Sequence, residues 1–162
     1  MKGISRTIRR RRAEGKTDYK SRLGLLKSGK PRVIVRKTNR YIIGQIIISD
    51  SAKDKTIVEA SSKELLSKGW PENLKGSLKN LSAGYLTGFL LGKKSKEIKE
   101  GILDAGLQRN VPNSRIYAFV KGLADSGFKI PHNKDVLPSD ELIERNEKTG
   151  KLIKRIKEGL GK

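Results

Sequence analysis

The distribution of apolar and polar residues changes several times along the chain. Residues 1–16 contain almost no apolar side chains and have nothing to bury, which predicts a mobile arm. From Thr17 to Gly29, apolar residues return at intervals of three and four, the spacing of one helical face. A threonine before such a pattern and a glycine after it are typical cap residues, so we expect a short amphipathic helix here.

Three short strands are predicted after this helix. Residues 32–38 alternate between apolar and mostly basic side chains, residues 41–49 are rich in isoleucine, and residues 55–60 form a third run of the same kind. The connection Thr38-Asn39-Arg40 is tight, and asparagine tolerates the positive φ that such turns often need. The three strands are therefore expected to form a meander.

The second half of the chain alternates between helical and strand patterns. We expect a core helix with one apolar face that ends at Gly92, a strand over residues 102–105 after a crossover, and a helix that ends at Gly127. Residues 139–162 carry apolar side chains amid alternating charge, which predicts helices packed weakly or against a partner. The order β-β-β-α-β-α places the chain in the α/β class.

The charge of the chain is extreme. Its 162 residues include 37 Lys or Arg and 17 Asp or Glu, so the formal net charge is +20 and the pI is near 10.3. Residues 1–40 alone hold 15 of the basic residues and 2 of the acidic ones. Because this charge disfavours the compact state through self-repulsion, we expect a polyanionic partner, with nucleic acid favoured over an anionic membrane surface.

The sequence gives no reason to expect a membrane partner or export. The longest apolar stretches, residues 41–48 and 85–91, are well short of the roughly 18 residues that a membrane span needs. Residues 1–22 lack the apolar region of a secretory signal. We therefore expect a cytoplasmic protein.

The residue types exclude most cofactor chemistry. The chain has no Cys, and His132 is its one His, so neither a thiol site nor a histidine-based metal site or triad can be assembled. Residues 24–31 approach the phosphate-binding loop motif, but Pro31 stands where a hydroxyl must hold Mg²⁺. We expect no cofactor, no metal and no small-molecule substrate.

A metal nuclease is the alternative from the enzyme class, and a DNA-packaging protein is the alternative from the binding class. A two-metal site needs carboxylates that converge from several elements. Residues 32–38 contain none, and the remaining candidates are Asp50, Glu59 and Asp104. The composition therefore favours a binding protein without excluding the nuclease.

The basic residues of the first strand and its turn suit RNA. Guanidinium groups such as that of Arg36 match phosphates, and the turn adds the Asn39 amide for a base edge and the Tyr41 ring for stacking. RNA is favoured over DNA because no helix-turn-helix, zinc-finger or basic-zipper pattern is present.

Eight ordered motifs carry a resemblance to a known family over about residues 15–140. The sequence resembles the archaeal branch of the universal 5S-rRNA-binding protein family of the large ribosomal subunit in the motifs DYKSRL (18–23), SGKPR (28–32), VRKTNRYI (35–42), ASSKEL (60–65), AGYLTG (83–88), GILDAGL (101–107), SRIYA (114–118) and IPH (130–132).

The resemblance implies an α/β domain of the ribonuclease-H-like shape without catalytic carboxylates. It implies a structural, non-enzymatic constituent of the large subunit that attaches 5S rRNA to the large-subunit rRNA in the central protuberance, beside neighbouring ribosomal proteins. We expect a basic arm (1–16), an RNA-binding α/β domain (17–138) and a C-terminal helical extension (139–162). The candidate RNA-binding residues are Arg9, Arg10, Arg11, Arg12, Lys20, Arg22, Lys30, Arg32, Arg36, Lys37, Thr38, Asn39, Arg40, Tyr41, Gln45 and Arg115.

Overall fold

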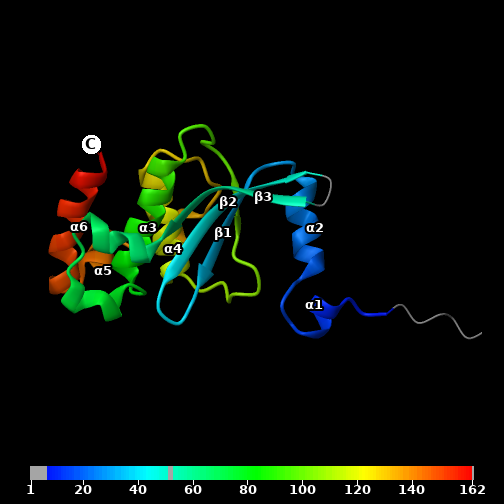
Figure 1. The fold of residues 1–162 in the computed structure, drawn as a ribbon, viewed down its shortest axis with the longest axis horizontal. Coiled ribbons are helices and arrows are strands. Elements are labelled where there is room, and N and C mark those ends of the chain that lie inside the picture. Colours follow the sequence, from blue (N-terminus) through cyan, green and yellow to red (C-terminus); the bar gives the residue numbers. More distant parts are fainter. Residues whose placement is uncertain (1–6, 51–52, 162) are drawn as a thin grey trace, which may run out of the picture.

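A mixed four-stranded sheet lies at the centre of the fold (Figure 1). The computed structural model describes residues 7–50 and 53–161. The strand order is β3-β2-β1-β4, with β1 antiparallel to β2, β2 antiparallel to β3, and β4 parallel to β1. The predicted meander and the strand after a crossover are thus confirmed, with the bounds β1 Arg32–Lys37, β2 Ile42–Asp50, β3 Lys53–Ser61 and β4 Ile102–Asp104.

Two helices cover one face of this sheet, α3 (Leu81–Lys94) and α4 (Arg115–Asp125). Glycines let them approach closely, since a Cβ at Gly122 would overlap the Tyr85 carbonyl oxygen. Every residue of α3 from Ser82 to Leu91 is buried, so the prediction of a single apolar face is too narrow. The reason is that α3 has packing partners on two sides.

A second apolar cluster lies on the other side of α3. It includes Ile143 of α5 (Asp140–Glu144), Ile153 and Ile156 of α6 (Glu147–Gly161), and Trp70. Lys157 also donates to the Tyr85 hydroxyl oxygen at 2.9 Å. The prediction that the C-terminal helices pack weakly or against a partner is therefore wrong, because their isoleucines are buried against this chain.

Short 3-10 helices connect the larger elements. Two of them, η1 (Ser62–Lys68) and η2 (Glu72–Ser77), lie between β3 and α3, and η3 (Lys134–Val136) lies between α4 and α5. Ser61 and Glu64 form a capping box at the start of η1, which fixes the exit of the chain from β3.

The N-terminal helices lie at the opposite end of the molecule from α5 and α6 (Figure 1). They are the single turn α1 (Arg10–Ala13) and α2 (Tyr19–Lys27), and neither has a buried residue. The N-cap of α2 is Asp18 and not the predicted Thr17, because the Asp18 carboxylate accepts the first-turn amides. Residues 1–6 of the predicted arm lie outside the described residues, and the mobility of the arm stays a prediction.

Candidate nucleic-acid interface

The predicted basic residues of the arm and α2 converge on one groove. This groove, the arm groove, measures about 900 Å³ and is lined by Arg9, Arg11, Arg12, Lys20 and Arg22 together with the exposed Leu23. Its shape is held by local contacts: the Arg9 guanidinium lies 4.7 Å from the centre of the Tyr19 ring, and Arg11 Nε donates to Thr17 Oγ1 at 2.9 Å. Arg10 points to Glu14 in an exposed ion pair of 3.7 Å.

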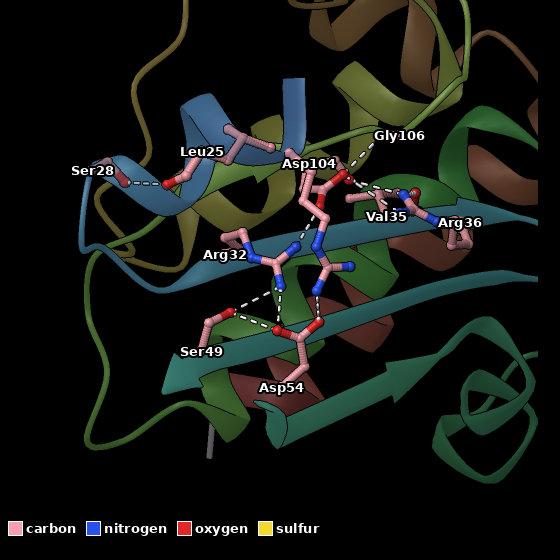
Figure 2. Close-up of polar contacts among 10 residues, drawn as sticks. Leu25, Ser28, Arg32, Val35, Arg36, Ser49, Asp54, Asp104 and Gly106 are labelled. Carbon is pink, nitrogen blue, oxygen red and sulfur yellow. Dashed lines mark hydrogen bonds and ion pairs between the residues drawn. The ribbon is translucent and has the colours of Figure 1, made fainter. Parts of the chain in front are cut away.

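Arg32 lies in a different environment from the one predicted for it. Its side chain is 2% exposed, with Nη2 at 2.8 Å from Asp54 Oδ1 and Nη1 at 2.9 Å from Asp104 Oδ2. Figure 2 shows the guanidinium between the two carboxylates, with Ser49 beside it. The prediction that Arg32 meets phosphate is wrong, because its charge is already neutralised inside the protein.

These four residues, Arg32, Ser49, Asp54 and Asp104, form the Arg32 cluster. Asp54 Oδ2 also pairs with Arg22 Nη2 of α2 at 2.7 Å, so the cluster connects α2 to the edge of the sheet. Burial raises the pKa of Asp54, but the hydrogen bonds from Ser49 and Arg32 and the nearby guanidinium charges outweigh it and hold that pKa below its ordinary value. The Asp54 carboxylate therefore stays ionised and holds Arg22 and Arg32 in place.

Arg36 lies between the Arg32 cluster and solvent. Its side chain is 43% exposed, yet Nη1 donates to the carbonyl oxygens of Val35 at 2.8 Å and Asp104 at 3.0 Å. The guanidinium lies against Gly106, where a Cβ would come within 3.0 Å of it. One side of the group is thus fixed by protein contacts, and the other remains available.

The turn between β1 and β2 is closed by backbone and side-chain bonds. The Thr38 amide donates to the Tyr41 carbonyl at 2.8 Å, and Thr38 Oγ1 accepts from the Tyr41 amide at 2.9 Å. Asn39 and Arg40 are exposed at the tip. Asn39 does not use the positive φ that an asparagine tolerates, since the Thr38 bonds close this turn without it; among the described non-glycine residues only Asn113 has a positive φ. Tyr41 is half-buried against the second apolar cluster.

The remaining predicted residues separate into paired and unpaired groups. Gln45 Nε2 donates to Glu59 Oε2 at 2.7 Å, and Lys30 lies 3.8 Å from Glu100. Arg115, in contrast, lines a second depression. We call it the cation cleft: it measures about 490 Å³ and is lined by Lys37, Arg109 and Arg115 with the apolar Leu81, Val111 and Ile116.

The carboxylates considered for a nuclease do not assemble. Asp104 is held by Arg32 and Arg36, and Glu59 faces Gln45. Within residues 7–50 and 53–161, no group of three or more His, Cys, Asp or Glu could hold a metal ion. In the same part of the chain, no helix has the length and apolar character needed to cross a membrane.

Comparison with known proteins identifies the family. Residues 5–100 match the family model described as "Ribosomal large subunit proteins 60S L5, and 50S L18". The chain belongs to this family. The matched range contains α1, α2, the three antiparallel strands and α3.

Archaeal members of the L5/L18 family are similar over most of the chain. A protein of Korarchaeum cryptofilum is 46% identical over 151 residues, which are 92% of this chain and 75% of that protein. One of Methanospirillum hungatei is 49% identical over 134 residues, 82% of this chain and 74% of that protein. One of Methanoregula boonei is 40% identical over 157 residues, 92% of this chain and 88% of that protein. Each is named "Large ribosomal subunit protein uL18".

The roles of three residues of this L5/L18 chain were not predicted from the sequence. Asp54 and Asp104 pair with Arg32 from positions 22 and 72 residues away in sequence, and no local pattern reports such pairing. Arg109 lies in a loop between β4 and α4, where periodicity carries no information. The nearest available signal is its place between two predicted elements, close to Arg115.

Proposed function

We propose that this chain is a structural constituent of the large ribosomal subunit that binds 5S rRNA and attaches it to the large-subunit rRNA in the central protuberance. Membership of the L5/L18 family carries the proposal, since the relatives are large-subunit proteins by name. The same membership supports a place in cytoplasmic ribosomes, among rRNA and other ribosomal proteins.

The surface supports RNA binding by adhesion. The arm groove and the turn present guanidinium and ammonium groups to solvent, and these groups release counterions when they meet phosphates. At the exposed tip Arg40 supplies a guanidinium for a phosphate, and Asn39, with Tyr41 behind it, supplies groups that contact bases of folded RNA. Phosphate contacts provide affinity, and the few base contacts provide selectivity.

The binding proposal is tested by comparing 5S rRNA with an unrelated folded RNA of equal length at one salt concentration. We expect tighter binding to 5S rRNA, and Arg40→Ala should weaken the binding of both RNAs because it removes a phosphate contact. Arg155→Ala is the matched control, since it removes an exposed arginine of α6 that is not among the predicted RNA-binding residues. Equal affinity for the two RNAs, or for duplex DNA, would contradict the proposal.

We also infer a ribonuclease-H-like fold that has no nuclease activity. The meander β1–β3 with β4 parallel to β1 supports the ribonuclease-H-like fold. The pairing of Asp104 with Arg32 supports the absence of nuclease activity, because this carboxylate is engaged by the protein. RNA and DNA incubated with the protein and Mg²⁺ or Mn²⁺ should remain intact. Cleavage that disappears in Asp104→Asn would overturn the non-enzymatic role.

A further inference from the structure

The cation cleft has the composition of a site for a single unpaired nucleotide. Its three cations come from three places, Lys37 at the end of β1, Arg109 in the loop before α4, and Arg115 at the start of α4. No carboxylate pairs with any of them within the described residues, whereas Arg22, Arg32 and Lys30 have such partners elsewhere. The cleft therefore holds a concentrated positive charge that the protein itself does not neutralise.

The cleft also has apolar walls, which a phosphate alone does not need. Leu81, Val111 and Ile116 line it, and Val111 is 50% exposed. Exposed apolar surface beside unpaired cations suits a planar aromatic base that is joined to a phosphate. The volume of about 490 Å³ lies in the range of roughly 300–1,000 Å³ that small-molecule pockets occupy.

Polar groups complete the set. Gln108 and Asn113 line the cleft, and their amides offer both donors and acceptors to a base edge. The N-cap of α4, Ser114, makes no side-chain bond to the first-turn amides, so these amides remain open to an anion.

The loop that carries these groups is anchored on both sides. The Tyr117 hydroxyl donates to the Asn110 side-chain oxygen, and the Asn113 amide donates to the Val136 carbonyl at 2.9 Å. Asn113 has φ +58°, a conformation held in place by these neighbours. A pre-formed loop loses little conformational freedom on binding, which favours a specific site over a general basic surface.

The cleft adjoins the turn already proposed to meet RNA. Lys37 directly precedes the turn, and a Cβ at Gly84 in α3 would lie 2.9 Å from the Arg115 carbonyl and 3.3 Å from Ile42 Cδ1. The starts of β2, α3 and α4 therefore meet at this end of the sheet. An RNA strand that contacts Arg40 can extend into the cleft without leaving the protein surface.

We propose that the cation cleft binds one unstacked nucleotide of RNA, with its base between the apolar walls and its phosphate at the three cations. The proposal rests on the proposed function and adds a second recognition site to it. An acidic peptide would match the cations but not the combination of apolar walls with the Gln108 and Asn113 amides that suit a base edge, so RNA is the occupant that the lining favours.

The test uses two single-stranded RNA hexamers with the same number of phosphates, one with bases and one abasic. Their dissociation constants are measured by fluorescence anisotropy against the full chain at one salt concentration. We expect the base-containing hexamer to bind about fivefold or more tightly, because a base that packs against the aliphatic walls removes apolar surface from water and the abasic hexamer cannot do so. Arg115→Ala should weaken the binding of both hexamers, and Arg155→Ala should weaken neither.

Two further variants locate the preference in the cleft. Asn113→Gly keeps the positive φ and removes the amide, and Val111→Ser removes an exposed apolar wall. Both should reduce the ratio between the hexamers toward one, while Ile57→Thr, a control at an exposed isoleucine outside the cleft, should leave it unchanged. Unchanged melting temperatures confirm that each variant is folded.

The outcomes separate this inference from the proposed function. If both hexamers bind equally, or if the ratio survives in Val111→Ser and Asn113→Gly, the cleft is not a nucleotide site. If 5S rRNA is still preferred over the unrelated RNA in that case, the proposed function stands without the cleft. If an acidic peptide competes for Arg115-dependent binding better than the base-containing hexamer, the cleft is a protein contact and the inference is overturned.

Discussion

The two ends of β1 place basic side chains in opposite surroundings. Arg32 at one end is 2% exposed and touches two carboxylates, while Lys37 at the other end opens on the cation cleft and has no acidic partner among the described residues. Both residues belong to β1, and they are five positions apart in sequence. A net charge of +20 therefore combines cations that hold the fold together with cations that are left for a polyanion.

The contrast predicts opposite effects when an arginine is replaced by alanine in the Arg32 cluster and in the cation cleft. Arg32→Ala should lower the free energy of unfolding by about 3–5 kcal/mol, because it leaves Asp104 buried with only the longer 3.5 Å contact to Arg36. Arg115→Ala should change it by no more than about 0.5 kcal/mol, as is usual for an exposed side chain. Urea unfolding measures both values.

RNA affinity should reverse this order. Measured where each variant is fully folded, Arg115→Ala should weaken RNA binding and Arg32→Ala should leave it nearly unchanged. An Arg32→Ala protein that is stable but binds RNA weakly would show that the Arg32 cluster belongs to the interface.

The pH dependence of stability tests the Arg32 cluster through Asp54. The folded state lowers the pKa of this carboxyl, so the stability it contributes is complete above its unfolded value of about 3.9 and is lost as the pH falls through the folded pKa. Asp54→Asn should cost about 1.5–3 kcal/mol at pH 7, the usual contribution of a hydrogen bond to a charged group.

Below about pH 4 the difference between Asp54→Asn and the parent protein should shrink, because the parent then loses the same charge. Urea unfolding at pH 7, 5, 4 and 3 provides the comparison. A difference that stays constant over this range would mean that Asp54 acts through packing and not through its charge.

Gly84→Ala tests the cleft end without removing a charge. The added Cβ would lie 2.9 Å from the backbone oxygen of Arg115, so the start of α4 must move away from α3. Overpacking of this kind costs about 1–3 kcal/mol. The same movement should weaken the binding of the base-containing hexamer, whereas Gly24→Ala in α2, where a Cβ meets no atom within 4 Å, is the control that should do neither.

The sequence predicts the framework better than it predicts the fate of individual charges. Periodicity located the strands, the crossover and α4, because burial repeats at fixed intervals. It placed Arg32 on the face shared with Arg36 but could not show that Asp54 and Asp104 reach that arginine, since such pairing depends on residues far apart in sequence. The interface has the same limit: the arm groove follows from a basic run, but the cation cleft requires Lys37, Arg109 and Arg115 to meet in space.

Arg36 has features of both ends of β1: it contacts Asp104 of the Arg32 cluster, and it directly precedes Lys37 of the cation cleft. Its role therefore shows whether structural and RNA-binding cations are separate sets. Its guanidinium donates to Val35 and Asp104, yet its side chain is 43% exposed. Arg36→Lys keeps the charge but cannot make both carbonyl bonds in the same geometry, so it should cost about 1 kcal/mol of stability.

If Arg36 serves the fold, RNA affinity should be unchanged in Arg36→Lys and also in Arg36→Ala at full folding. If it serves RNA, Arg36→Ala should flatten the salt dependence of binding by about one phosphate contact, while Arg36→Lys preserves it. We expect the second result together with the loss of stability, because one side of the guanidinium is occupied by the protein and the other faces solvent. If the two variants change stability alone, Arg36 is a structural residue like those of the Arg32 cluster, and Lys37 is then the first residue of β1 that binds RNA.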